Sequence, residues 1–378
     1  MNPTAVRTFV EDRLEDYLAE LKALVEHESP SGDKPRLDAL AGTIAARWAG
    51  LGGEVDRLAN GAGDHLVGRF FGSIAEKPAL VVGHFDTVWP VGTIDRLPFR
   101  REGDRLYGPG AYDMKASLVL VAAVFEAFAA LGLAPRRPVT VLFTSDEEVG
   151  SKTSRALIED LARESLHALV LEPPLADGSL KTARKGVGRF GLEVQGRAAH
   201  AGVAPEQGAS AVVELAHQIL RIQALNDPAS GTTVNVGTVQ GGTTPNVVPA
   251  HAMAQVDARA VTIAGAEALE RAMAGLAAAT PGTRVTVSGG FNRPPMERTP
   301  GVAALFERAR AIGAALGLAL AEGSTGGGSD GNFTAAVGTP TLDGLGTPGG
   351  GAHADDEHIL YKALPERAAL LAALLMEI

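Results

Sequence analysis

Three short apolar runs shape the first half of the chain, at residues 79–82, 139–143 and 168–171. Since apolar side chains fill almost every position of these runs, the pattern predicts strands that are buried on both faces of a sheet. The Ala- and Leu-rich segment 114–133 lies between the first two runs and predicts a long helix. This alternation of strand and helix indicates α/β architecture, in which helices cover the sheet.

The N-terminal segment, residues 1–28, has a helical pattern of its own. Apolar residues recur at helical spacing among acidic ones, at Phe9, Leu14, Leu18 and Leu21. We therefore expect one charged amphipathic helix there. No basic stretch precedes an apolar core in this segment, so a signal peptide is not expected.

Residues 185–295 follow a different pattern, in which shorter strands alternate with two helices. The predicted elements are a strand at 187–195, a helix at 208–225, strands at 232–240 and 252–261, a helix at 264–280 and a strand at 284–288. This βαββαβ order is that of the ferredoxin-like unit. We therefore predict a first domain, made of residues 1–184 and 296–378, that is interrupted by an inserted domain at 185–295.

Composition and charge narrow the range of possible functions. The 378 residues carry a net charge of -10, with 44 acidic against 34 basic residues, which argues against nucleic acid or an anionic membrane as a partner. The absence of cysteine excludes disulfides, thiolate zinc sites and cysteine nucleophiles, so any metal must be bound by His, Asp or Glu. No uninterrupted apolar run of about 18 residues stands out, so we expect no membrane span and a cytoplasmic location.

Each of the three predicted strands of the first half ends in side chains of a metal-binding kind. His84 follows the first strand, Glu147 and Glu148 follow the second, and Glu172 follows the third. Ligands in open α/β sheets bind beyond the carboxyl ends of the strands, so these side chains should converge at one edge. A single histidine or acid in such a place is often structural, but three strands that share the feature indicate a metal site.

Neighbouring residues extend this candidate site. Asp86 lies two residues after His84 on an extended segment, so it faces the same way and can accept the second imidazole N–H. Glu147 and Glu148 should diverge in extended chain, so that one binds metal while the other faces a bound water as a base. The alternative is an acidic loop ahead of a helix N-terminus. Asp113, after a Gly-Pro-Gly approach, is either a helix N-cap or a carboxylate that bridges two cations.

Short motifs that follow one another along the chain strengthen this interpretation. They are Gly-His-Phe-Asp-Thr-Val at 83–88, Tyr-Gly-Pro-Gly-Ala-Tyr-Asp-Met-Lys at 107–115, Phe-Thr-Ser-Asp-Glu-Glu-Val-Gly-Ser at 143–151, Glu-Pro at 172–173, Ala-His-Ala-Gly at 199–202, Gly-Thr-Thr-Pro-Asn-Val-Val-Pro at 242–249 and Gly-Ala-His at 351–353. Together they resemble the di-zinc metallopeptidase and deacylase family that includes bacterial glutamate carboxypeptidases, acetylornithine deacetylase and succinyl-diaminopimelate desuccinylase. The resemblance covers nearly the whole chain and is greatest to the carboxypeptidase G branch.

The resemblance implies a fold and a metal centre. The fold is expected to be a di-zinc exopeptidase-like α/β/α catalytic domain with an inserted ferredoxin-like α+β domain that serves for dimerisation or as a lid. Two divalent metal ions are implied, with Zn²⁺ expected first and Co²⁺ or Mn²⁺ as alternatives. By this resemblance His84 and Glu172 bind one ion, His353 and Glu148 bind the other, and Asp113 bridges them.

Three further side chains are implied to take part in the reaction. By resemblance Glu147 is the general base, and Asp86 orients His84. His200 comes from the partner subunit of a homodimer and stabilises the tetrahedral oxyanion, although a surface histidine is the alternative. The family also has a cis peptide bond after the bridging aspartate, here Asp113.

The inserted domain and the glycine-rich segment after it supply the expected substrate-binding residues. Asn246 and Arg259 match family positions that bind the substrate carboxylate, a role that suits the bidentate guanidinium group. The alternative for Arg259 is an ion pair with Asp257 or a neighbour. Gly327 and Gly328 are expected to offer backbone groups to the substrate.

The expected reaction is hydrolysis of an amide bond next to a free carboxylate. The first candidate is a glutamate-type carboxypeptidase that acts on small peptides or N-acyl amino acids. The alternative is an N-acyl amino-acid deacylase of the acetylornithine deacetylase or desuccinylase type, which uses the same chemistry. An inactive metal-binding protein on this fold is a third class. Loss of a ligand or of the base would indicate it, and none is lost here.

Overall fold

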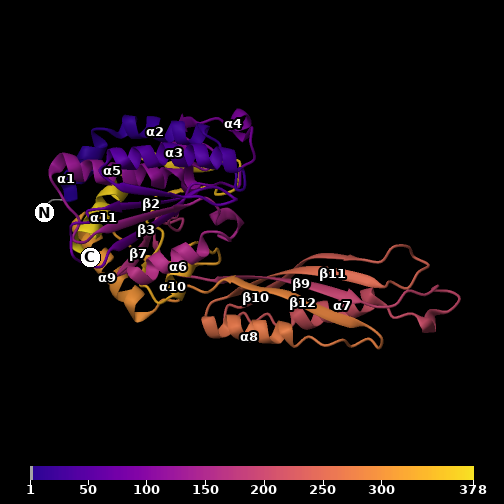
Figure 1. Cartoon of the computed structure of the whole chain (residues 1–378). Helices are drawn as coiled ribbons and strands as arrows, with labels where there is room; N and C mark the ends of the chain where they lie inside the picture. The colour runs from indigo at the N-terminus through magenta and orange to yellow at the C-terminus, as the bar shows by residue number, and fades with distance from the viewer. Residues whose placement is uncertain (1–2) are drawn as a thin grey trace. The chain divides into compact units, whose positions relative to one another are not determined.

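The computed structural model describes residues 3–378, which form two compact units (Figure 1). The large unit comprises residues 3–183, 298–325 and 329–378, and the inserted unit comprises residues 184–297 and 326–328. These divisions lie within two residues of the boundaries expected from the sequence. The short segment 326–328 groups with the inserted unit, whereas the sequence placed it in the interrupted domain.

A six-stranded sheet forms the centre of the large unit, in the order β1-β2-β6-β3-β7-β14. Its strands are β1 Glu54–Leu58, β2 His65–Phe70, β3 Ala79–His84, β6 Val139–Thr144, β7 His167–Val170 and β14 Thr341–Leu342. The three apolar runs are β3, β6 and β7, and β3 lies between the other two and parallel to both. Their carboxyl ends therefore lie at one edge of the sheet, where His84 is paired with Thr144.

Helices cover both faces of this sheet (Figure 1). They are α3 Lys34–Gly50, α5 Ala116–Leu131 and α11 Leu364–Glu377 on one face, and α6 Arg155–Glu164 and α10 Gly331–Ala336 on the other. Val81 packs into the first layer and Leu80 into the second. Because successive strand residues point to opposite faces, both faces are apolar, and the layers are α/β/α as predicted.

The N-terminal segment differs from the prediction of a single helix. The chain forms two helices, α1 Pro3–Glu11 and α2 Leu14–Glu26, while residues 1–2 lie outside the described part. The break at residues 12–13 redirects the chain, so that α1 packs on α11 and α5 while α2 packs on α5. Both helices pack on α5, but α1 packs mainly on α11, and this packing overrides the continuous helical pattern.

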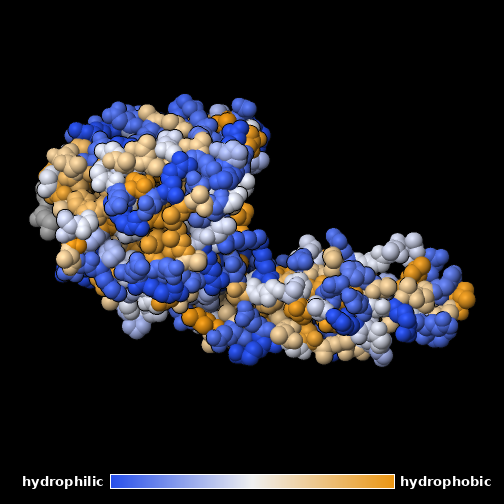
Figure 2. Space-filling model, viewed as in Figure 1, coloured by the Kyte–Doolittle hydropathy of each residue, from blue (hydrophilic) through white to orange (hydrophobic). Residues whose placement is uncertain are grey.

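Helix α5 is apolar along most of its length. The stretch Ala111–Leu131, which contains it, has the length and composition of a helix that can cross a membrane, yet 78% of its most apolar window is buried inside the protein. It packs against α1, α2, α3 and α11. Hydrophilic residues cover much of the visible surface of the molecule, with apolar residues scattered among them (Figure 2). The apolar character of α5 is therefore that of a core helix.

The inserted unit has the predicted βαββαβ order. Its elements are β9 Gly186–Gln195, α7 Ala211–Gln223, β10 Thr233–Gly241, β11 His251–Ala260, α8 Ile263–Ala274 and β12 Arg284–Arg293. The strands form one antiparallel sheet in the ferredoxin-like order β10-β11-β9-β12. Helix α8 ends at Ala274, earlier than predicted, and in the segment that follows the Glu214 carboxylate accepts the backbone N–H groups of Ala279 and Thr280.

Shorter elements complete the chain. A four-stranded antiparallel sheet is formed by β15 Gly349–Gly350, β16 His358–Leu360, β5 Arg105–Tyr107 and β4 Arg100–Glu102, and a two-stranded sheet by β13 Glu322–Thr325 and β8 Leu180–Arg184. The remaining helices and turns are α4 Thr93–Arg96, α9 Pro300–Ala315, the π turn η1 Ala111–Lys115, and the 3-10 turns η2 Glu147–Val149, η3 Pro205–Gln207 and η4 Tyr361–Ala363.

Candidate metal centre

Metal-binding side chains gather where the parallel strands of the large unit end. His84 is the last residue of β3, and Glu172 follows β7. His84 Nε2 lies 3.2 Å from Asp113 Oδ1 and 3.6 Å from Glu172 Oε1. These three residues offer ligand atoms that all lie within 4.8 Å of one another, which is compact enough for one metal ion.

A second group of donors shares Asp113 with the first. His353 Nε2 lies 3.4 Å from Asp113 Oδ2 and 3.2 Å from Glu148 Oε2. The two oxygens of Asp113 therefore face the two histidines, one each. This is the arrangement expected of a carboxylate that bridges two cations, and the N-cap alternative is not observed, because α5 has Lys115 at its N-cap position.

The electrostatics of the donors favour positive charge between them. Hydrogen bonds to Asp113 and Glu148 raise the pKa of His353 to about 10. Burial opposes protonation of His84, yet its hydrogen bonds to Asp113 and Asp86 raise its pKa well above the usual value. Burial also favours a neutral Asp113, yet hydrogen bonds from the two histidines hold its pKa well below its usual range. A cation that replaces the histidine protons meets the same carboxylates, so metal binding and proton release are coupled.

The residues present also fit metal ions by their chemistry. Among residues 3–378, Glu148 Oε1 is buried and has no hydrogen-bond partner, so this oxygen is available to a ligand. The donor set consists of imidazole nitrogens and carboxylate oxygens, which suit zinc, cobalt or manganese. The other carboxylate oxygen of Glu148, Oε2, lies 3.2 Å from His353 Nε2.

Asp86 contributes more than the sequence indicated. Its backbone oxygen lies 3.0 Å from His84 Nδ1, and its carboxylate Oδ1 lies 3.4 Å from the same nitrogen. The two carboxylate oxygens also accept the backbone N–H groups of Glu147 and Glu148, each at 3.2 Å, and one accepts the Ser31 hydroxyl at 2.7 Å. One side chain therefore reaches both a candidate ligand and the turn that carries the candidate base.

The conformation of the Glu147–Glu148 pair differs from the expected extended chain. The pair lies in the 3-10 turn η2, directly after Asp146. The carboxylate of Asp86 holds two successive N–H groups, which curls the chain at this point. The Asp146 carboxylate in turn accepts N–H and O–H groups of Thr153 and the hydroxyl of Ser154. A buried hydrogen-bond network thus supports the turn from behind.

Two residues near Asp113 were not recognised in the sequence. The peptide bond between Asp113 and Met114 is cis, as the resemblance implied. Glu357 accepts the backbone N–H of Asp113 at 3.0 Å, and burial raises the pKa of Glu357 to about 7. Lys115 is fully buried and donates to the carbonyl oxygens of Leu24 and His27, and burial lowers its pKa to about 7. Glu357 stands in no recognisable spacing, and Lys115 ends the motif at 107–115 without a role assigned from it, so the fold reveals what both residues contact.

The remaining predicted residues belong to the inserted unit. His200 forms a β-bridge with Val247, and the N–H of Ala201 donates to the backbone oxygen of Asn246 at 3.0 Å, so the two loops lie side by side. Both His200 and Asn246 are exposed. The structure therefore brings these two residues together within the inserted unit, while the five metal donors belong to the large unit.

Arg259 is engaged in the ion pair that the sequence left as the alternative. Its Nε and one terminal nitrogen donate to the two carboxylate oxygens of Asp257, both at 2.9 Å. The other terminal nitrogen donates to the backbone oxygen of Gly326 at 3.1 Å. The carbonyl oxygens of Gly327 and Gly328 accept from Arg184 at 3.2 and 3.1 Å. The glycine segment is thus tied to the inserted unit by two arginines.

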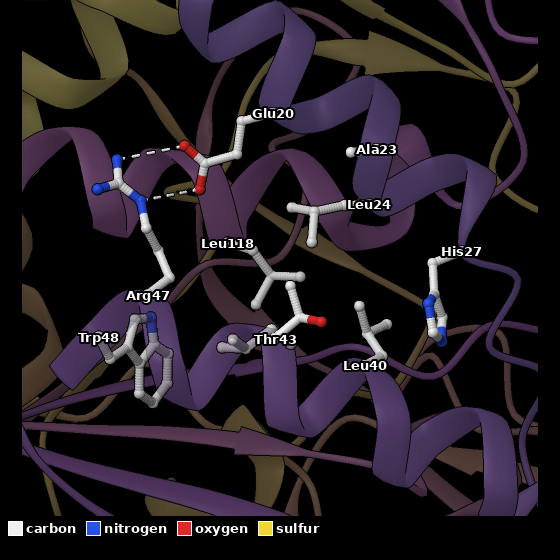
Figure 3. A pocket seen from close by; sticks show the side chains of 10 residues that line it. Glu20, Ala23, Leu24, His27, Leu40, Thr43, Arg47, Trp48 and Leu118 are labelled. Atoms are coloured by element: carbon white, nitrogen blue, oxygen red, sulfur yellow. Dashed lines mark hydrogen bonds and ion pairs between the residues drawn. The ribbon is translucent and has the colours of Figure 1, made fainter. Parts of the chain in front are cut away.

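A pocket elsewhere in the large unit is lined by none of the predicted catalytic, metal-binding or substrate-binding residues. It encloses about 530 Å³ between α2 and α3 and is also lined by α5 (Figure 3). Leu24, Leu40 and Leu118 point into it, and the ion pair of Arg47 with Glu20 borders one side. It lacks a cluster of polar donors comparable to the metal centre, so the chemistry of the molecule is better explained by the latter.

The fold and the donor set define a class, an α/β/α scaffold that carries two groups of His and carboxylate side chains able to hold metal ions. The chain belongs to the peptidase family M20/M25/M40, whose family model matches residues 80–377. It is 33% identical over 372 residues to carboxypeptidase G2 of Pseudomonas sp. strain RS-16, which covers 95% of this chain and 88% of the relative. It is 31% identical over 351 residues to succinyl-diaminopimelate desuccinylase of Verminephrobacter eiseniae strain EF01-2, which covers 84% of this chain and 86% of the relative.

Solved structures share the same fold. Aminopeptidase PepT from Bacillus cereus ATCC 10987 has a TM-score of 0.80 at 24% identity and covers 96% of this chain and 98% of its own. The M20 family metallo-carboxypeptidase Sso-CP2 from Sulfolobus solfataricus has a TM-score of 0.70 at 19% identity and covers 95% of this chain and 99% of its own. Family membership and the donor set together make this chain a metal-dependent hydrolase of the peptidase and deacylase kind.

Proposed function

We propose that this chain is a two-metal carboxypeptidase that removes a glutamate-type C-terminal residue from small peptides or N-acyl amino acids. The observation that carries the proposal is the pair of donor groups that share Asp113, in a chain that is 33% identical to carboxypeptidase G2 over nearly its whole length. A free carboxylate next to the scissile amide is the substrate feature that such an enzyme recognises.

The large unit supplies the groups for amide hydrolysis. In this proposal His84 and Glu172 would hold one divalent ion, such as zinc, His353 and Glu148 would hold the other, and Asp113 belongs to both donor groups. Held by these residues, two metal ions would supply Lewis acidity and would lower the pKa of a water molecule.

Proton transfer falls to Glu147, the first glutamate of the turn. Glu147 takes the proton of the attacking water and delivers it to the leaving nitrogen, as a general base and then a general acid. Its backbone N–H is held by Asp86, which also contacts His84. The base therefore keeps a fixed place relative to a metal ligand.

The inserted unit supplies the proposed contacts to substrate. His200 stabilises the oxyanion of the tetrahedral intermediate, and Asn246 and Arg259 bind the substrate carboxylate. Arg259 has to exchange part of its pairing with Asp257 for the substrate, because both of those hydrogen bonds are formed in the structure. Gly327 and Gly328 are proposed to contribute backbone groups.

A homodimer through the inserted unit is part of the proposal. Strand β10 is an edge strand of its sheet, and Val239 on it is 53% exposed. On α7, Val213 is 50% and Leu220 is 71% exposed. An open strand edge beside exposed apolar side chains is typical of a surface that another chain covers.

A substrate panel tests the proposed reaction. The metal-free protein should be loaded with Zn²⁺, Co²⁺ or Mn²⁺ and assayed with dipeptides ending in glutamate, N-acyl glutamates, N-acetylornithine and N-succinyl-diaminopimelate. We expect chelator-sensitive release of C-terminal glutamate. Turnover of the acylated amino acids without turnover of any dipeptide would favour the deacylase, which the 31% identity to a desuccinylase supports. A protein that binds two metal ions and hydrolyses nothing would overturn both.

A further inference from the structure

One buried carboxylate beside the metal donors has no role in the proposed reaction. Glu357 is only 3% exposed, and its two oxygens accept four N–H groups. Oε1 accepts the backbone N–H groups of Tyr112 and Asp113, at 2.9 and 3.0 Å. Oε2 accepts the backbone N–H of Gly110 at 2.9 Å and the indole N–H of Trp89 at 2.6 Å. Both oxygens are therefore engaged with donors from other segments.

These contacts join three segments that carry candidate metal ligands. Trp89 lies on the loop that follows His84 at the end of β3. Asp113 lies in η1, and its own backbone N–H is bound by Glu357. Glu357 is the last residue of the loop between β15 and β16, and this loop carries His353. One side chain thus connects the segments of three of the five donors, which are far apart in the sequence.

The loops around Glu357 have unusual backbone conformations. His353 has φ 62°, a left-handed conformation that is uncommon for a residue other than glycine. Gly110 has φ 72° and Gly351 has φ 73°. A Cβ added to Gly351 would lie 2.8 Å from the backbone of Asp356, so this loop closes tightly. Such turns leave backbone N–H groups without helical or sheet partners, and a buried N–H without an acceptor is costly.

We infer that Glu357 is a positioning residue of the metal centre. Its carboxylate fixes the backbone of Asp113 relative to the segments of His84 and His353, and thereby sets the spacing between the two donor groups. The inference rests on the proposed two-metal function. Because Asp113 belongs to both donor groups, loss of this support weakens both metal sites together.

The test separates positioning from a merely structural contribution. Glu357→Gln keeps the shape of the side chain but replaces one acceptor oxygen with an NH₂ group, which faces two N–H donors. The matched control is Glu214→Gln in the inserted unit, since Glu214 is also fully buried and accepts backbone N–H groups, of Ala279 and Thr280. Affinity for Zn²⁺ and Co²⁺ is measured on the metal-free proteins by competition with a chelating indicator, at a temperature where circular dichroism shows all of them folded.

We expect Glu357→Gln to weaken both binding steps by about 10- to 100-fold, as is typical when a carboxylate that orients metal ligands is removed. The visible absorption of the Co²⁺-loaded protein should change in the same variant. Glu214→Gln should destabilise the fold and leave metal affinity as in the wild type. Wild-type affinity in Glu357→Gln would overturn the inference, whereas a wild-type protein that binds no metal would overturn the proposed function instead.

A second variant covers the case in which Glu357→Gln does not fold. Trp89→Phe removes a single donor to Glu357 Oε2 and keeps an aromatic side chain at the position. We expect a smaller loss of affinity, in the same direction for both binding steps. Unchanged affinity in a folded Trp89→Phe protein would count against the inference.

Discussion

The metal donors of the large unit and the substrate-binding candidates of the inserted unit are held in place in different ways. His84 is buried, and its imidazole touches Asp86, Asp113 and Glu172 through side-chain atoms. His200 is exposed, and its loop is held to the loop of Asn246 mainly by backbone hydrogen bonds. The first arrangement fixes side chains before a ligand arrives, and the second fixes the chain and leaves the side chains facing solvent.

This difference has an energetic reason. A buried polar group needs partners, so the metal donors and their supports form a network in which one substitution disturbs several groups. An exposed side chain has little effect on the free energy of folding, and it contributes to binding only when substrate is present. Substitutions of the metal donors and their supports should therefore act on metal affinity and kcat, whereas substitutions of the proposed carboxylate-binding residues Asn246 and Arg259 should act on KM.

The largest effect is expected for Glu147→Gln. The change removes the proposed base without removing a metal donor, so kcat should fall by about 10²- to 10⁴-fold while two metal ions still bind. The measurements are kcat on the best substrate of the panel and metal content of the purified variant. Glu164→Gln, an exposed change at the end of α6, serves as the control and should behave as the wild type. A variant with nearly wild-type kcat would show that Glu147 is not the base.

Asp86→Asn should come next. The amide keeps the shape of the side chain but loses the charge that faces His84 and one of the two acceptor oxygens that hold the Glu147–Glu148 turn. Metal affinity and kcat should each fall by about 10- to 100-fold. The exposed Asp16→Asn change on α2 is the matched control. Unchanged metal affinity would mean that His84 is oriented by the backbone oxygen of Asp86, which lies 3.0 Å from Nδ1.

Arg259→Met tests the inserted unit. If Arg259 binds the substrate carboxylate, KM should rise by about 10- to 100-fold, as expected for a lost hydrogen bond to a charged group, with metal affinity unchanged. Asp257→Asn is the informative partner, because it removes the competing carboxylate and should not raise KM. Equal effects of both substitutions on stability, with no change in KM, would identify the pair as purely structural.

The smallest effect concerns stability. Burial favours a neutral Glu214, but hydrogen bonds from Gln218 and from the N–H groups of Thr280 and Ala279 lower its pKa to about 2, from 4.5. A carboxyl group with a lowered folded-state pKa stabilises the fold above pH 4.5 and loses this contribution as the pH falls toward 2. Glu214→Gln should lower the free energy of unfolding by about 1–3 kcal/mol at neutral pH.

Chemical unfolding of both proteins across this acid range checks the sign. The difference between wild type and Glu214→Gln should shrink as the pH is lowered from neutral. A difference that stayed constant down to the lowest pH would show that the charge of Glu214 makes no contribution.

Local patterns of apolar and polar residues were sufficient to predict much of the fold. The runs that became β3, β6 and β7 are continuous and apolar because both of their faces are covered, and the βαββαβ order of the inserted unit follows from its own alternation. The same patterns predicted that His84, Glu148 and Glu172 converge, since parallel strands end at one edge. Asp113 and His353 were expected from the resemblance, because nothing in their local spacing separates a metal ligand from a cap or a loop residue.

Other features were decided only by tertiary contacts. The N-terminal pattern is continuous, yet the chain breaks at residues 12–13, and the first half packs mainly on α11 while both halves pack on α5. From the sequence, Arg259 could either contact substrate or form an ion pair. In the structure it forms the ion pair with Asp257. Glu357 lies in an ordinary acidic run, and its four donors come from segments more than 240 residues away in the chain. Periodicity records which side of an element is buried, but the partner of a buried polar group is set by how distant segments pack.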